Sequence, residues 1–448
     1  MSNKSPSEKT VGEAGSTYVG FDSVTPFQVE LRKRIPKIPI LLMILVFFSA
    51  FTGIANDAMV PGVEELMEDF KVDGNTVQQI VPYFVIGNGI GLFLWGPTID
   101  RFGRRTIIVF CGLLAIALNF VATFVDTFSH LLAVRVVQGI VYAGMGAVPS
   151  VVLKDIFSPR DFVVYNSWLI TLFLFTPALA PLMGGWIILH ASWVWVFHAI
   201  SALIVIAIIL YIVRIPETLD PEKRQPLNTI RIIKNYGSIL MTPSSLWILI
   251  LSIFYMLVII GPPSLLPVVA IKEYNIPGEY FGYISLPIVL CVMAGIQVNQ
   301  FFLRRKASPI KLWLIGTTLQ LISLIANLIV IFTHQNLFLI LGCICLNCSF
   351  NGLQLGNTMA IYLMRYPHMT GTASSLLNGS RMLIGGLIVT AISHLPINGG
   401  KTLLISITIS LAIAAVLSYS YNLIWSTNVK SKNLAVDLKP EQEQEPSK

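Results

Sequence analysis

Long apolar runs separated by short polar segments cover most of this 448-residue chain. A helix needs about 20 mostly apolar residues to cross the hydrocarbon core of a bilayer. Twelve runs have this length, and they are centred near residues 48, 88, 116, 142, 174, 204, 257, 290, 321, 350, 382 and 413. The pattern predicts an all-α integral membrane protein with twelve transmembrane helices.

The composition agrees with this prediction and argues against a globular enzyme. Hydrophobic residues make up 54% of the chain and charged residues 12%, about half the charged share of a soluble domain. No pairing of a nucleophile with a base and no metal-ligand spacing stands out, so we expect neither enzymatic activity nor a cofactor or metal. The cysteines lie in apolar runs without His or acidic neighbours, and we expect them to pack rather than bind metal or form disulfides: Cys111, Cys291, Cys343, Cys345 and Cys348.

The distribution of Lys and Arg predicts the orientation, because cytoplasmic loops are enriched in these residues. With the N-terminus inside, only Lys71, Lys272 and Lys401 fall outside, while Arg135 and Arg381 fall within spans. The first outer loop is acidic. We therefore expect both termini in the cytoplasm. The net charge of +7 is explained by inner loops facing anionic lipid, without nucleic-acid binding.

The longest polar segment between apolar runs, residues 214–243, divides the chain into two halves of six spans. We expect it to be a cytoplasmic linker between an N-terminal six-helix bundle at 36–213 and a C-terminal one at 244–426. The ends at 1–35 and 427–448 are polar, and we expect both to be solvated cytoplasmic tails.

Asp57 is the acidic residue that stands out within a span. A charged side chain in the bilayer is costly, so we look for a functional reason for it. It is a candidate for a carboxylate that takes up and releases a proton as a cavity opens to each side. The alternative is a residue at the outer end of the first span.

Arg135 is the second charged residue within a span, and Gln138 and Tyr142 share its helical face. An arginine keeps its proton, so Arg135 is a candidate for a fixed positive charge beside an acidic partner. The alternative is a buried structural donor to backbone carbonyls. Arg381 is the corresponding residue of the second half, within about a turn and a half of the inner end of its predicted span. It either contacts substrate or extends to the membrane surface.

Two further segments have unusual composition. The loop between the second and third spans carries charges and glycines that cap helices at the membrane surface and hold them together: Gly96, Asp100, Arg101, Gly103, Arg104 and Arg105. The fifth span combines small residues with prolines, which favours a bent, closely packed helix: Pro177, Ala180, Pro181, Gly184 and Gly185. An ordinary kinked helix is the alternative for the fifth span.

Together, these segments resemble the drug:proton antiporters of the major facilitator superfamily, and more narrowly the Bcr/CflA and MdfA-type multidrug exporters. Asn56-Asp57 followed by Val60-Pro61-Gly62 is similar to the first-span motif of MdfA-like proteins, which implies a protonation role for Asp57. Arg135 with Gln138-Gly139 is similar to the fourth-span motif tied to proton coupling. The loop at 96–105 resembles the conformational latch of the superfamily, and the fifth-span residues resemble its antiporter motif.

The resemblance implies a proton-driven exporter in the bacterial inner membrane, working by alternating access without a cofactor. Expected substrates are lipophilic and neutral, zwitterionic or monocationic, and the expected partners are protons and lipid, with the protein a monomer. Export of one endogenous metabolite such as a siderophore and proton-coupled uptake remain as alternatives. Expected cavity residues are Asn56, Met59, Tyr83, Gln138, Tyr142 and Arg381.

Overall fold

The computed structural model describes residues 26–173, 175–220, 224, 229–333, 336–366, 369–395 and 399–426. The N-terminal half contains α1 (Pro26–Arg34), α2 (Ile38–Asp57), η1 (Val60–Gly62), α3 (Val63–Phe70), α4 (Gly74–Val77), α5 (Ile80–Phe102), α6 (Arg104–Ala122), α7 (Phe128–Ile156), α8 (Pro159–Phe173), α9 (Thr176–His190) and α10 (Trp193–Arg214). After α11 (Thr229–Leu240), the C-terminal half contains α12 (Pro243–Tyr274), η3 (Gly278–Tyr280), α13 (Phe281–Arg304), α14 (Pro309–Phe332), α15 (Leu337–Leu363), α16 (Thr370–Ser393), α17 (Gly399–Tyr421) and η4 (Asn422–Ser426).

Within the described ranges, twelve helical segments are long and apolar enough to cross a membrane, and each contains one of the predicted centres. The all-α architecture and the twelve spans predicted from the sequence are therefore confirmed. A helix satisfies its backbone hydrogen bonds internally, which is why apolar runs in lipid adopt this structure.

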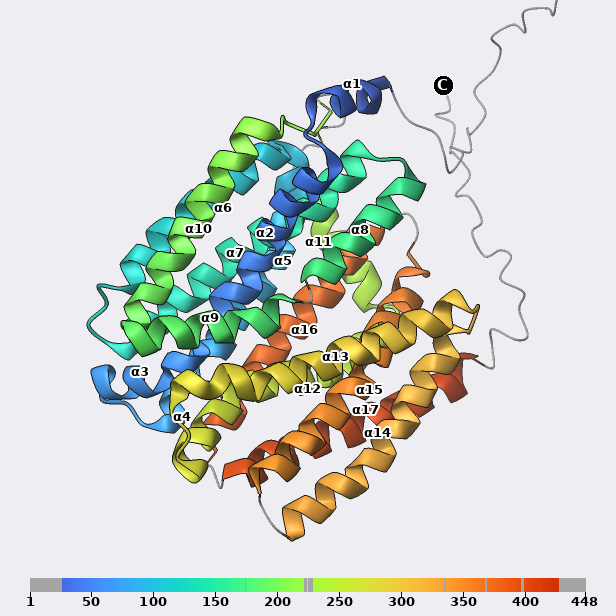
Figure 1. The fold of residues 1–448 in the computed structure, drawn as a ribbon. Coiled ribbons are helices and arrows are strands. Elements are labelled where there is room, and N and C mark those ends of the chain that lie inside the picture. Colours follow the sequence, from blue (N-terminus) through green and yellow to red (C-terminus); the bar gives the residue numbers. More distant parts are fainter. Residues whose placement is uncertain are drawn as a thin grey trace, which may run out of the picture.

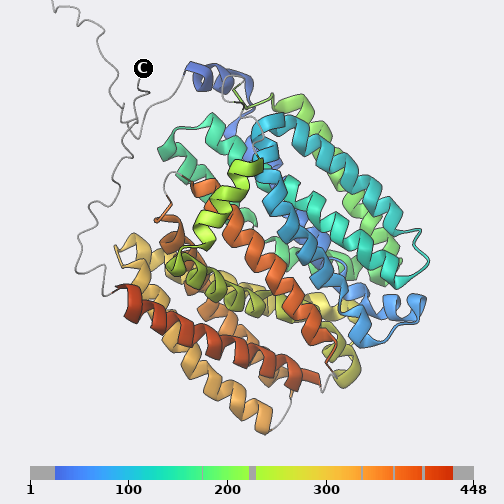
Figure 2. The same cartoon turned by 180° about the vertical axis from the view of Figure 1, so that it is seen from behind.

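The two halves form separate bundles, seen in Figure 1 as a blue-to-green group and a yellow-to-red group. Figure 2 shows α16 lying along α5 at their boundary. This contact is close along its length: a Cβ on Gly89 would lie 2.4 Å from the backbone nitrogen of Leu383, and one on Gly96 3.4 Å from Ser375 Oγ. Helices α9 and α13 form the other large contact between the halves.

The halves also meet at the end of the molecule that holds η1 and η3, which we call the far end. Glu64 Oε2 accepts a hydrogen bond of 3.1 Å from the backbone N–H of Gly278 in η3. Gln79 Nε2 and His394 Nε2 lie 3.3 Å apart across the same boundary. We call this set of contacts the far-end seal.

The opposite end, which holds α1 and the linker, is called the linker end. Here α8, the first part of the fifth span, packs on α2 and α7 of its own half, whereas α9 packs on α13. The contact between the fifth and eighth spans is therefore concentrated toward the far end.

Two polar segments contain helices that the sequence analysis did not predict. Residues 26–34 of the expected solvated tail form α1, which is docked on its own half. Arg32 pairs with Asp161 at 3.2 Å and donates to the carbonyl of Ile156 at 3.1 Å. The expected linker contains α11, which contacts α12 and α16. Residues 1–25 and 427–448 lie outside the described residues.

Candidate functional site

Asp57 is the twentieth and last residue of α2, about 30 Å along the helix axis from Ile38. It therefore lies toward the far end of the first span, and the helical stretch continues past it to Phe70. Its side chain is half-buried, and in the part of the chain that is described its carboxylate receives one hydrogen bond, from Asn56 Nδ2 at 2.8 Å. Asp57 thus keeps acceptor capacity for another partner.

Arg135 lies behind this segment and is fully buried (0% exposed). Its guanidinium donates to the carbonyl of Ala55 at 3.0 Å, to the carbonyl of Ile80 at 3.3 Å and to Gln138 Oε1 at 3.2 Å. It also stacks over the ring of Phe84 at 4.6 Å. Arg135 therefore joins α2, α5 and α7, and its bond to Ala55 lies two residues before Asp57.

The hydrogen-bonded network around Arg135 extends through residues that the sequence analysis missed. Gln138 Nε2 donates to Asn119 Oδ1 at 3.0 Å, and Asn119 exchanges bonds with the hydroxyl of Tyr142 at 3.0 and 3.1 Å. Asn119 also donates to Ser201 Oγ at 3.1 Å. Gln138 and Tyr142, predicted to line a cavity, are fully buried in this network.

Among the other predicted cavity residues, Asn56 and Tyr83 are half-buried, and Met59 is fully buried (0% exposed) in the hydrophobic core. Asn56 orients the carboxylate of Asp57. Met59 faces no open space in this conformation.

The glycines of the fifth span pack against both halves. A Cβ on Gly184 would lie 2.0 Å from the carbonyl oxygen of Ala58, directly after Asp57. A Cβ on Gly185 would lie 2.3 Å from the carbonyl oxygen of Glu279 in the other half. Pro177 and Pro181 lie in the same helix, and Ala180 is buried. The fifth span thus packs against the segment that bears Asp57 on one side and against the far-end seal on the other.

The loop at 96–105 is organised around Arg104, which is 5% exposed. Arg104 pairs with Asp155 at 2.7 Å and with Asp100 at 3.1 Å. Gly103 has a φ of 93°, and a Cβ there would lie 2.5 Å from Glu217 Oε2, so glycine is required.

Glu217 caps the start of α6. Its carboxylate accepts hydrogen bonds of 3.0 Å from the backbone N–H groups of Arg104 and Arg105, where the helix dipole favours a negative charge. Arg101 is exposed. Among the described residues, the charged partners of the loop all belong to its own half. In this conformation the loop therefore holds α5, α6, α7 and the exit of α10 together. The sequence indicated the loop but not its partners Asp155 and Glu217.

The C-terminal bundle contains a second polar network, built from neutral side chains. Asn347 bonds to Asn327 at 3.0 Å and to Ser323 at 2.5 Å, and Asn351 donates to the carbonyl of Tyr255 at 2.9 Å. Such residues carry no proton-linked charge. These residues are not evident from the sequence, because single amides and hydroxyls stand out in an apolar segment far less than charged residues do.

Arg381 is the charged residue deep in this bundle. It is the twelfth residue of α16, about 16 Å from the start of that helix. The prediction that it lies within a turn and a half of the inner end is therefore wrong, and extension to the surface does not account for it. One guanidinium nitrogen donates to Asn378 Oδ1.

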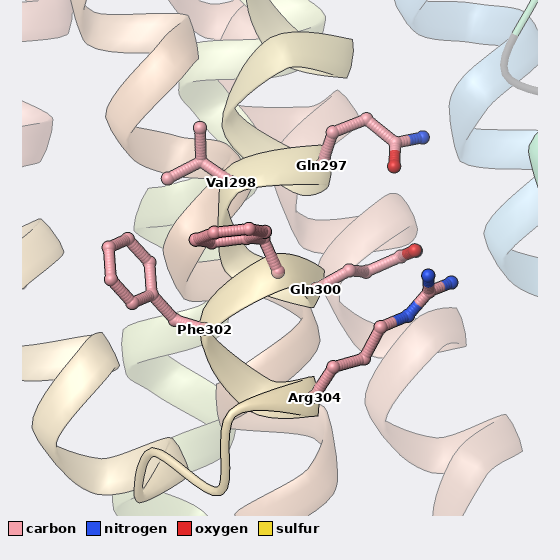
Figure 3. A pocket seen from close by; sticks show the side chains of 6 residues that line it. Gln297, Val298, Gln300, Phe302 and Arg304 are labelled. Carbon is pink, nitrogen blue, oxygen red and sulfur yellow. The ribbon is translucent and has the colours of Figure 1, made fainter.

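A hollow of about 540 Å³ lies along the last turns of α13. Gln297, Gln300 and Arg304 extend to one side of the helix, and Val298 and Phe302 to the other (Figure 3). Gly282, at the start of α13, lies against Leu182 of α9, whereas the hollow lies at the other end of α13. All five cysteines are free, and the described residues contain no cluster of His, Cys, Asp and Glu suited to a metal.

Comparison with known proteins places this arrangement in a family. The model of the Major Facilitator Superfamily matches residues 42–390. A bicyclomycin resistance protein homolog of Haemophilus influenzae is 24% identical over 88% of this chain and 98% of its own length. Multidrug resistance protein MdtM of Escherichia coli is 22% identical over 81% of this chain and 87% of its own. The structure of a D-xylose–proton symporter superposes with a TM-score of 0.70 at 13% identity, covering 86% of this chain and 98% of that one. The chain therefore belongs to the major facilitator superfamily, and it is a transporter rather than an enzyme.

Proposed function

We propose that this protein is a proton-driven exporter of lipophilic small molecules in the bacterial inner membrane, with Asp57 as its proton-coupling residue. The similarity to proteins named for bicyclomycin and multidrug resistance supports export of drug-like compounds. The clustering of Lys and Arg supports an orientation with the linker end in the cytoplasm. The described conformation is then closed to the outside by the far-end seal.

The observation that carries the proposal is the direct connection between Asp57 and the far-end seal. Four residues after Asp57, the carbonyl oxygen of Pro61 lies 2.3 Å from the Cβ position of Gly278 in the other half. Three residues further on, Glu64 bonds to the same Gly278. A change in charge at Asp57 therefore acts on the segment that closes the far end.

Exchange follows if the ionised and the protonated carboxylate favour different conformations. A ligand shifts such an equilibrium only through its different affinity for the two states. Protons from outside would favour one state, and substrate binding near ionised Asp57 the other. Arg135 would supply a fixed positive charge and, through the carbonyl of Ala55, hold the end of α2 in place.

The proposal is tested by proton-gradient-driven accumulation of ethidium, a lipophilic monocation, and chloramphenicol, a neutral compound, in everted membrane vesicles. Wild-type protein should accumulate one or both. Asp57→Asn should remove at least nine-tenths of the gradient-driven signal while the protein is still inserted in the membrane. A variant that keeps normal accumulation would contradict the role of Asp57.

Asp126→Asn is the matched control, because Asp126 is an exposed aspartate in the turn between α6 and α7. It should transport like the wild type. Failure of the wild type to accumulate either compound would contradict the proposed function itself.

A further inference from the structure

The guanidinium of Arg381 has unused donors. Its Nε and Nη1 are buried and have no hydrogen-bond partner, and its third nitrogen is bonded to Asn378. Arg135, the comparable residue of the other half, makes three hydrogen bonds and leaves a single nitrogen, Nη2, without a partner. Because buried polar groups are normally paired, these two donors of Arg381, which are unpaired among the described residues, are available to water or to a bound ligand.

No carboxylate of the described chain lies within ion-pair distance of Arg381. Residues 244–426 contain only two acidic residues, Glu273 and Glu279. Both lie at the far end: Glu273 accepts from the backbone of Gly400 at 2.9 Å, and Glu279 belongs to η3. On the other half, Arg135 is the cation that acts on Asp57. Within the described ranges, no acidic side chain therefore compensates the positive charge of Arg381.

The side chain belongs to a polar face of α16. Ser374, Asn378 and Arg381 follow at intervals of four and three residues and so share one side of the helix. They are joined by hydrogen bonds, with Asn378 Nδ2 donating to Ser374 Oγ at 3.2 Å. All three side chains are half-buried, so none is fully packed away.

The same face of α16 points toward α12, where the interior has open space. Gly385, one turn beyond Arg381, approaches Ile260 of α12 at a Cβ distance of 3.4 Å. The next residue, Gly261, is buried, and nothing lies within 4 Å of the position of its missing Cβ. The space beside α12 is therefore open at this position.

We propose that Arg381 binds a carboxylate of the transported molecule, so that lipophilic zwitterions and acids are among the substrates. The inference rests on the proposed transport function and names a substrate class for it. An arginine suits this task because it remains charged and its planar group donates to carboxylates with defined geometry. Asn378 acts as a positioning residue that holds the guanidinium against α16.

The experiment compares dansylglycine, a fluorescent lipophilic carboxylate, with its uncharged methyl ester. Binding to the purified full-length protein in lipid nanodiscs is followed by dansyl fluorescence without a proton gradient. Wild-type protein should bind the acid about tenfold or more tightly than Arg381→Gln does, because hydrogen bonds to a charged group are lost. The ester should bind the two proteins with affinities within about twofold of each other.

Two further variants distinguish the effect of the lost charge on binding from an effect of misfolding. Arg381→Lys keeps the charge and should recover part of the preference for the acid. Arg305→Gln removes an exposed charge at the end of α13 and should leave both affinities unchanged. Ester binding by Arg381→Gln confirms that this variant is folded.

Equal affinity of the wild type for acid and ester would overturn the proposal. So would failure of the acid to bind up to millimolar concentration, or an Arg381→Gln variant that retains the full preference. Because the measurement is made without a proton gradient and at one pH for all proteins, these outcomes do not depend on gradient-driven transport. Loss of gradient-driven transport in vesicles, by contrast, bears on the proposed function alone.

Discussion

At the scale of single residues, the two halves differ in the kind of polarity they bury. In the N-terminal half, Arg135 of α7 donates a hydrogen bond to the carbonyl of Ala55, which lies two residues before Asp57 in α2. The C-terminal half buries amides and hydroxyls, with Arg381 as the charged exception. A proton-linked change in charge is therefore available in the first half, while the second half offers a fixed positive charge.

Arg135→Lys should weaken both stability and coupling. A lysine replaces a planar set of donors by a point charge and cannot serve Ala55, Ile80 and Gln138 together. We expect a loss of about 2 kcal/mol of unfolding free energy, the scale of a broken buried hydrogen bond to a charged group. Thermal unfolding in detergent measures the stability, and the pH dependence of ethidium transport measures the coupling.

Arg214→Lys, at the exposed last residue of α10, is the control and should leave both properties unchanged. An Arg135→Lys protein with lower stability but an unaltered pH profile would make Arg135 a purely structural residue. One unaltered in both respects would contradict the hydrogen-bonded arrangement itself.

The sequence indicated Asp57 and Arg135 because a charge stands out in an apolar run and is costly there. It could not indicate Asn119 or Asn347, since single amides are common in membrane helices and reveal their partners only when the helices pack. Arg381 lies deeper than predicted because α16 already begins at Thr370. The first residues of this helix are polar, so hydropathy does not mark its start, and helix boundaries are the least reliable part of a prediction from sequence.

At the scale of elements, the fifth span connects the candidate proton site with the boundary between the halves. Gly184 lies against the backbone that follows Asp57, and Gly185 lies against Glu279 of the other half. Small residues permit this close approach of helix backbones in a membrane. The sequence predicted the close packing of this helix, but only the structure supplies both of its neighbours.

Gly184→Ala should push α9 away from α2, because the new methyl group would lie 2.0 Å from the carbonyl oxygen of Ala58. Overpacking of this kind costs about 1–3 kcal/mol. We expect a lower unfolding temperature and slower proton-driven transport. Gly342→Ala is the matched control, since nothing lies within 4 Å of its Cβ position and it should cause no loss. Equal thermal stability of the two variants would contradict the close packing.

Helices outside the spans show where hydropathy is a poor guide. The helix α1 is polar and short, and it is held by Arg32 reaching Asp161 more than a hundred residues away. Likewise, Glu217 caps α6 from the exit of α10. Apolar runs predict which segments enter the membrane, but contacts between distant polar segments depend on the assembled bundle.

At the scale of the whole molecule, the contacts between the halves concentrate at the far end and along α5 and α16. If the protein works by alternating access, as we propose, the far-end seal opens during each cycle. The general architecture was predictable from the twelve apolar runs. Which end is closed was not, because that depends on pairs such as Gln79 and His394.

Linking the halves at the far end should stop transport. In a Gln79→Cys/His394→Cys protein, a short reducible bis-methanethiosulfonate reagent should bridge positions whose native side chains are 3.3 Å apart. Ethidium accumulation should then fall to background and recover on reduction. Each single-cysteine variant and the wild type with its five native cysteines should be affected far less by the same treatment. Continued transport by the bridged protein would contradict opening at this end.

The most direct test of the account is proton release from purified protein in weakly buffered detergent solution when ethidium is added. If substrate binding favours ionised Asp57, the wild type should release protons on addition of ethidium, and Asp57→Asn should release none while still binding the dye. Equal release by the two proteins, or ethidium binding to the wild type without any release, would contradict proton exchange at Asp57.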